Sequence, residues 1–120
     1  MKKILIVDDE PNIVMSLEYT FKKNNFEVFI ARDGQEALDI LKTQQPDIII
    51  LDVMMPMVDG FATLEQIKKE ERLRGCKVIF LSAKNKEKDI EKGLALGADL
   101  YMTKPFSVKK LVEQVNQLLA

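Results

Sequence analysis

The stretch Asp47-Ile48-Ile49-Ile50-Leu51-Asp52 decides the fold, because it is an unbroken apolar run that ends abruptly on a carboxylate. Four apolar residues without polar alternation are typical of a strand buried on both faces, as in a parallel sheet covered by helices. Pro46 disfavours a helix that continues into the run, and Pro56 with Asp59-Gly60 marks the loop that follows. We therefore expect Asp52 at the carboxyl end of a central strand, the edge at which open parallel sheets bind ligands.

The rest of the chain alternates strand-like and helix-like segments. Short apolar runs predict further strands at Ile4–Val7, Val28–Ala31, Val78–Leu81 and Leu100–Met102. Between these runs and after the last one, apolar residues recur at helical spacing and predict five helices. Their apolar residues are Ile13, Val14, Leu17 and Phe21; Ala37, Leu38 and Leu41; Phe61, Leu64 and Ile67; Ile90 and Leu94; and Val108, Leu111, Val112, Val115, Leu118 and Leu119. Five strands alternating with five helices predict an α/β fold, a doubly wound parallel sheet with strand order 2-1-3-4-5 and helices on both faces, the flavodoxin-like arrangement.

Several helix ends carry recognisable signals. Asp33 with Glu36 three residues later forms a capping box, and Ser107 is expected to cap the last helix. Gly75 is expected to end the segment that starts at Asp59-Gly60, and Gly97 to close the helix before the last strand.

Composition narrows the function classes. The 120 residues, 47% apolar and 31% charged with a net charge of -1, predict one globular domain over residues 1–120 without an electrostatic footprint for nucleic acid or a membrane. Met1-Lys2-Lys3 leads into an apolar run too short for a signal peptide or a membrane span, so we expect a cytoplasmic location. The lone Cys76 excludes an internal disulfide, and the absence of His excludes His-based acid/base chemistry.

The predicted sheet brings a set of polar residues to one edge. Asp8 and Asp9 follow the first strand, Asp52 the third, Ser82 the fourth and Lys104 the fifth. Carboxylates crowded in a low-dielectric crevice raise each other's pKa, and a divalent cation relieves the repulsion. Mg²⁺ suits such a site because it prefers oxygen ligands and is commonly held by one or two carboxylates plus phosphate oxygens.

The same set fits phosphoryl transfer. A carboxylate such as Asp52 can act as a nucleophile and form an acyl phosphate when a donor is presented in line. Lys104 and the Ser82 hydroxyl could then neutralise or bind the equatorial oxygens together with the metal. A plainer alternative is that Asp9 caps the first helix ahead of Pro11 and that Lys104 only neutralises the acidic residues, but it leaves Asp52 unexplained.

Four motifs, in order, give the chain a resemblance to a known family. They are Val7-Asp8-Asp9-Glu10, Leu51–Pro56 with Asp59-Gly60, Leu81-Ser82-Ala83, and Gly97-Ala98-Asp99 followed by Tyr101–Phe106. From Lys3 to Ala120 the sequence resembles the receiver (phosphoacceptor) domain of bacterial two-component response regulators.

The resemblance implies a signalling switch and not an enzyme with its own substrate. Asp52 would accept a phosphoryl group from a sensor histidine kinase or a phosphotransfer protein, and Ser82 and Lys104 would contact that group. Mg²⁺, or Mn²⁺, would be held by Asp8, Asp9, Asp52 and the backbone carbonyl of Met54. The switch residues would be Ser82 and Tyr101, the Lys104-Pro105 bond would be cis, and the fourth helix, fifth strand and fifth helix would form the responding surface for an output domain or effector protein.

Two alternatives remain at this point. An aspartyl-phosphate-forming phosphatase or phosphotransferase also uses an Asp at a strand end, although such enzymes resemble one another in a second Asp two residues on, where this chain has Met54. A flavin-type binding module would need a Gly/Ser/Thr-rich phosphate loop after the first strand, where this chain has three acidic residues, Asp8 to Glu10.

Overall fold

The sheet has five parallel strands in the order β2-β1-β3-β4-β5, which confirms the predicted topology. The computed structural model describes residues 1–120. The strands are β1 (Lys2–Val7), β2 (Phe26–Ala31), β3 (Ile48–Leu51), β4 (Lys77–Ser82) and β5 (Leu100–Thr103). The helices are α1 (Pro11–Lys23), α2 (Gly34–Leu41), α3 (Gly60–Lys69), α4 (Glu87–Ala95) and α5 (Val108–Leu119), with a 3₁₀ turn η1 (Glu71–Leu73).

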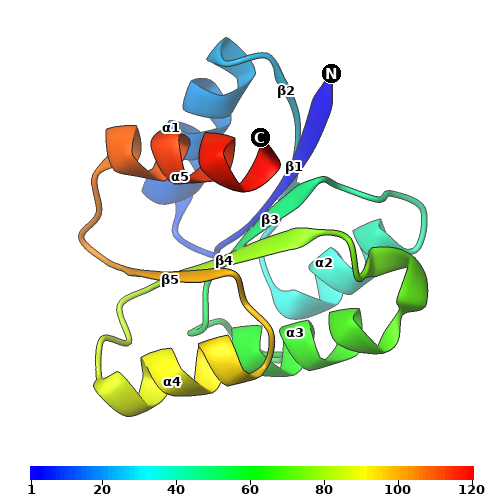
Figure 1. Cartoon of the computed structure of the whole chain (residues 1–120), viewed down its shortest axis with the longest axis vertical. Helices are drawn as coiled ribbons and strands as arrows, with labels where there is room; N and C mark the ends of the chain where they lie inside the picture. Colours follow the sequence, from blue (N-terminus) through cyan, green and yellow to red (C-terminus); the bar gives the residue numbers. More distant parts are fainter.

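Helices cover both faces of the sheet, α1 and α5 on one side and α2, α3 and α4 on the other (Figure 1). All four residues of β3 are buried, and successive side chains point to opposite faces. Ile48 and Ile50 join the apolar core under α1 and α5, whereas Ile49 and Leu51 join the core under α2 and α3. The uninterrupted apolar run is thus explained by two cores that share one strand.

The parallel register fixes which strand ends are neighbours. Val7 pairs with Leu51, and Phe80, two residues before the end of β4, also pairs with Leu51. The residues that follow β1 and β3, Asp8 and Asp52, therefore leave the sheet side by side at its carboxyl edge.

Both predicted N-caps are present, and the structure adds a third at Asp59. The Asp33 side chain accepts a hydrogen bond from the Glu36 N–H (2.8 Å), and the Ser107 side chain accepts one from Lys110 N–H (3.2 Å). Asp59 caps α3 in the same way through Ala62 N–H (2.8 Å). The capping box is modified, because the Glu36 carboxylate accepts from Arg32 N–H rather than from Asp33 N–H.

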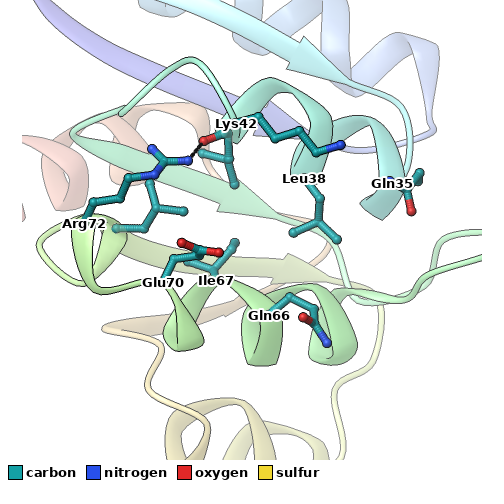
Figure 2. A pocket seen from close by; sticks show the side chains of 9 residues that line it. Gln35, Leu38, Lys42, Gln66, Ile67, Glu70 and Arg72 are labelled. Carbon is teal, nitrogen blue, oxygen red and sulfur yellow. Dashed lines mark hydrogen bonds between the residues drawn. The ribbon is translucent and has the colours of Figure 1, made fainter.

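The segment expected to run to Gly75 ends earlier as a helix. α3 stops at Lys69, the backbone of Glu70 is extended (φ -90, ψ 112), and η1 follows before Gly75. This break lets Leu73 point into the core and lets Arg72 donate a hydrogen bond to the Leu41 carbonyl at the end of α2. The pair closes one end of a hollow of about 250 Å³ between α2 and α3, which Figure 2 shows. Helix ends leave carbonyls without partners, so this guanidinium has a structural role there.

The helix α4 packs differently from the expectation. Its one buried residue is Gly93, and Leu94, which was expected on the inner face, is 45% exposed. A Cβ at residue 93 would lie 2.9 Å from ring atoms of both Phe80 and Tyr101. The missing side chain lets the helix backbone approach the sheet closely, and Gly97 (φ 111) then turns the chain into β5 as predicted.

None of the helices combines the length and the apolar character that a membrane crossing requires.

Candidate functional site

Asp8 and Asp52 are the buried carboxylates of the molecule, each 3% exposed. The backbone of each extends the sheet by one hydrogen bond, from Asp8 N–H to Ala31 O (3.1 Å) and from Asp52 N–H to Val7 O (2.9 Å). The sheet therefore fixes the Cα positions of both aspartates.

Lys104 reaches this edge from the segment after β5. Its ammonium donates hydrogen bonds to Asp8 Oδ2 (3.0 Å) and Glu10 Oε1 (2.9 Å) and lies 3.5 Å from Asp52 Oδ2. The Lys104 side chain is only 10% exposed, and its backbone N–H donates to the Ser82 carbonyl at the end of β4 (2.9 Å). The Lys104-Pro105 peptide bond is cis.

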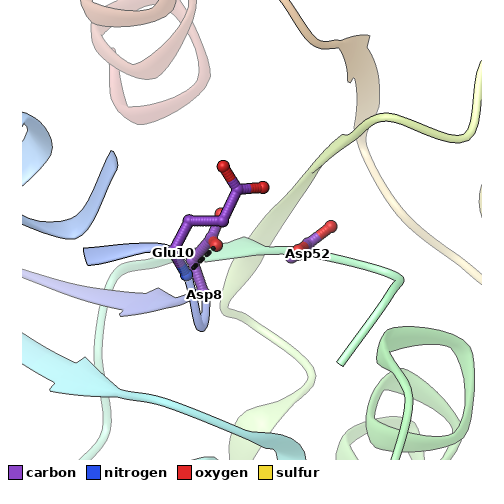
Figure 3. A group of neighbouring side chains, drawn as sticks. All are labelled: Asp8, Glu10 and Asp52. Atoms are coloured by element: carbon purple, nitrogen blue, oxygen red, sulfur yellow. Dashed lines mark hydrogen bonds between the residues drawn. The ribbon is translucent and has the colours of Figure 1, made fainter. Parts of the chain in front are cut away.

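Glu10 joins the carboxylate group, whereas Asp9 does not. Carboxylate oxygens of Asp8, Glu10 and Asp52 lie within 4.8 Å of one another (Figure 3). Asp9 is exposed and instead lines a neighbouring hollow of about 500 Å³, beside Met54. The helix-capping alternative for Asp9 finds no support, since α1 has Glu10 at its N-cap position and no side chain caps it.

Sequence reasoning overlooked Glu10 as a contact of Lys104. The alternation of an extended strand could not have found it, because β1 ends at Val7 and the chain bends at Asp9. The backbone N–H of Glu10 also donates to Asp8 Oδ1 (2.9 Å), which fixes the Asp8 carboxylate (Figure 3).

Burial sets the protonation of the two aspartates. Desolvation, with the nearby Asp8 charge, raises the pKa of Asp52 to about 6, and desolvation also raises the pKa of Asp8. Burial alone would lower the pKa of Lys104, but its hydrogen bonds to Glu10 and Asp8 outweigh this, so that its pKa is raised and it stays charged. One ammonium facing three carboxylates leaves a formal charge of -2 when all three are ionised.

This donor set fits a divalent cation. The oxygens are hard ligands of the kind that Mg²⁺ prefers, and the surplus negative charge matches its charge. The site of the expected Met54 ligand is adjacent, because the Met54 N–H donates to Asp52 Oδ1 (3.4 Å). The Met54 side chain is itself 56% exposed, so the residue is placed at the site through its backbone.

Ser82 and Tyr101 are connected through the backbone of Lys84. The buried Ser82 hydroxyl accepts a hydrogen bond from Lys84 N–H (3.2 Å), and the Tyr101 hydroxyl donates to Lys84 O (2.7 Å). The Tyr101 ring is half-buried and packs against Phe80, with ring centroids 5.7 Å apart. A shift of the segment at Lys84 would therefore reach both hydroxyls.

The chain is similar to known proteins over almost its whole length. The family model of the response regulator receiver domain matches residues 4–116. The chain is 43% identical over 118 residues to the alkaline phosphatase synthesis transcriptional regulatory protein PhoP of Bacillus subtilis (strain 168); this match covers 98% of the chain but only 48% of PhoP.

Solved structures of similar proteins share the whole fold. The receiver domain of a Francisella response regulator is 36% identical, with a TM-score of 0.90, and the match covers 98% of this chain and 96% of that one. The chemotaxis response regulator CheY4 of Vibrio cholerae is 29% identical with a TM-score of 0.92, and the match covers 98% of both chains.

Proposed function

The chain belongs to the family of response regulator receiver domains, which are signalling proteins, and we propose that Asp52 is its phosphoryl acceptor. The observation that carries the proposal is the position of Asp52, a buried carboxylate held by the sheet at the end of β3 with the Lys104 ammonium 3.5 Å away. With its pKa raised to about 6, Asp52 is mostly ionised at neutral pH and available as a nucleophile.

In the proposed transfer, an Asp52 carboxylate oxygen attacks the phosphorus of the donor. The bond from phosphorus to the donor's leaving group breaks as the new P–O bond forms, and the leaving group departs with the electron pair. Attack of water on the acyl phosphate would later release inorganic phosphate and regenerate the carboxylate. The chain would contribute position and charge, since Lys104 lies 3.5 Å from Asp52 and Ser82 ends β4, the strand beside β3.

We further propose that Mg²⁺, or Mn²⁺, is held by Asp8, Asp9, Asp52 and the backbone carbonyl of Met54, since Asp9 lines the hollow beside Met54. These residues would hold the metal so that its positive charge is available to the phosphoryl oxygens during the transfer. Asp8 is fixed for this role by the hydrogen bond from Glu10 N–H, so its side chain does not need to be ordered by the metal.

The proposed response runs from Ser82 to Tyr101. A phosphoryl group on Asp52 adds strong acceptor oxygens, and the Ser82 hydroxyl can donate to one of them. The Ser82 hydroxyl would turn toward the phosphoryl group and away from the Lys84 N–H that it now accepts from. The segment at Lys84 would then shift, and its carbonyl is the acceptor of the Tyr101 hydroxyl. The surface of α4, β5 and α5 would respond, since Tyr101 lies on β5 against Gly93 of α4.

The proposed partners follow from the family. A sensor histidine kinase or a phosphotransfer protein would donate the phosphoryl group, and an output domain or a separate effector would read the altered surface. The net charge of -1 gives no basis for direct binding of nucleic acid. A phosphatase acting on its own substrate gains no support, because Met54 cannot act as a general acid at the position two residues after Asp52.

The proposal is tested by intact-mass spectrometry after incubation with acetyl phosphate, with Mg²⁺ and with EDTA. We expect the mass of one phosphoryl group to be added in Mg²⁺ only, and to be absent in Asp52→Asn. The exposed Asp39→Asn is the matched control and should be modified like the wild type. Modification of Asp52→Asn at the wild-type rate would show that another residue is the acceptor.

A further inference from the structure

We propose that Glu10 is a releasable restraint on Lys104, a positioning residue that keeps the ammonium on the β1 side of the site until a phosphoryl group is attached to Asp52. This inference rests on the proposed role of Asp52 and extends it. It starts from the two hydrogen bonds of the Lys104 ammonium, to Glu10 Oε1 (2.9 Å) and to Asp8 Oδ2 (3.0 Å), while Asp52 is farther away at 3.5 Å.

To donate a hydrogen bond to a phosphoryl group on Asp52, the Lys104 ammonium has to move away from its present partners, Asp8 and Glu10. An ammonium has three donors and no acceptor, and two of its donors already hold short hydrogen bonds to carboxylates on the β1 side of the site. A move toward oxygens beyond Asp52 stretches both bonds, because Asp8 and Glu10 belong to the same turn after β1. The ammonium already lies 3.5 Å from Asp52 Oδ2, and a closer approach on that side weakens at least one of the two bonds.

Burial decides which bond is lost. Asp8 is 4% exposed at its side chain, and its other oxygen is fixed by Glu10 N–H, so that releasing Asp8 would leave a desolvated charge without its cation. The Glu10 side chain is 55% exposed, so water can replace the ammonium at little cost. Negative charge added at Asp52 also repels the Glu10 carboxylate.

Space for the released side chain is present. Glu10 and Lys104 line one side of an open hollow of about 490 Å³, whose other walls are formed by Ile13, Ala83, Pro105 and Phe106. The Glu10 carboxylate can therefore turn toward solvent without any backbone change, and its N–H stays on Asp8.

The variants separate this role from simple charge repulsion. Glu10→Gln removes both the charge and the strong pair, whereas Glu10→Asp keeps the charge on a side chain that is one methylene shorter, which weakens the pair with Lys104. Both variants leave the backbone bond to Asp8 intact. Glu18→Gln is the matched control, because Glu18 forms an equally short pair with Lys22 (2.9 Å) on the exposed side of α1.

The first measurement is the rate of Asp52 phosphorylation by acetyl phosphate in Mg²⁺. We expect both Glu10→Gln and Glu10→Asp to react about two- to fivefold faster than the wild type, the range that an exposed ion pair supplies, and Glu18→Gln to be unchanged. A wild-type rate in Glu10→Asp would assign the effect to charge alone and overturn the restraint. Slower reaction with weaker Mg²⁺ binding in Glu10→Gln would make Glu10 a metal ligand instead.

The second measurement is the side-chain NMR signal of Lys104, which reports its partners without any turnover. We expect the Lys104 signals of wild type and Glu10→Gln to differ in the free proteins and to coincide after saturation with beryllofluoride, a phosphoryl mimic, because Glu10 has then been released. Signals that stay apart in the saturated proteins would overturn the inference. Absence of any modification of wild-type Asp52 would instead refute the proposed function.

Discussion

Replacing Asp52 by Asn should stabilise the protein in a pH-dependent way. The fold holds this carboxylate in a buried place that disfavours its charge and raises its pKa from 3.8 to about 6. A group whose pKa is raised on folding binds its proton more tightly in the folded state, so the free energy of unfolding falls as the pH rises from about 4 to about 6. The pKa rise corresponds to about 3 kcal/mol.

Asn keeps the shape and an oxygen that can accept the Met54 N–H, but it carries no charge to desolvate. We therefore expect Asp52→Asn to be about 2–3 kcal/mol more stable than the wild type at about pH 8 in EDTA, and the difference to shrink to about 0.5 kcal/mol or less near pH 4. The expected 2–3 kcal/mol already includes the loss of the attraction between Asp52 and Lys104, since that attraction lowers the same pKa.

The assay is urea unfolding followed by far-UV circular dichroism at a series of pH values, with EDTA throughout. Asp39→Asn serves as the control, because the Asp39 side chain is 55% exposed and its pair with Lys42 lies on the surface. The reasoning would be refuted by a stability difference that is constant across the pH series. It would equally be refuted by an Asp52→Asn protein that is less stable than the wild type at the higher pH.

Three further predictions concern metal, relay and packing. Mg²⁺ at about a hundredfold excess over its Kd should raise the free energy of unfolding by about 2.7 kcal/mol, and Asp8→Asn should lose this gain; a melting temperature indifferent to Mg²⁺ would contradict the site. In NMR spectra of the beryllofluoride-bound protein, Ser82→Ala should bind the mimic but lose the chemical-shift changes at Tyr101; a full set of these changes would show that the hydroxyl is not the relay. Gly93→Ala should cost about 1–3 kcal/mol in urea unfolding, because its methyl group would lie 2.9 Å from two rings, whereas Gly75→Ala, with nothing within 4 Å, should be close to neutral; equal effects of the two would contradict the close approach of α4.

The strands were predictable because burial on both faces leaves a direct mark on the sequence. A short, continuous apolar run such as Ile48–Leu51 is stable only where both of its faces are buried, as in a central strand. Once the alternation of strands and helices fixes the strand order, Asp8, Asp52 and Lys104 have to lie at the same edge of the sheet. These long-range relations depend on the pattern of whole segments, which a single sequence contains.

Side-chain directions within short segments were not predictable in the same way. Whether Asp9 or Glu10 faces Lys104 depends on the backbone angles of a turn of a few residues, which the composition of that turn does not specify. α4 has two apolar residues, Ile90 and Leu94, too few to fix the rotation of the helix, and the inward position of Gly93 depends on the two rings beneath it.

The burial of β3 has a consequence for how the molecule opens. Ile4 pairs with Ile48, and Ile48 pairs with Lys77, so the strand that carries Asp52 is bonded on both sides to segments far away in the sequence. Its amides should exchange with solvent only when the whole domain unfolds, while α4, with a single buried glycine, can open alone. Amide hydrogen exchange should then separate two cooperative units, a slowly exchanging one that carries the proposed acceptor and a rapidly exchanging one on the face proposed to respond. Such a division would let that face change its conformation often without disturbing the geometry around Asp52.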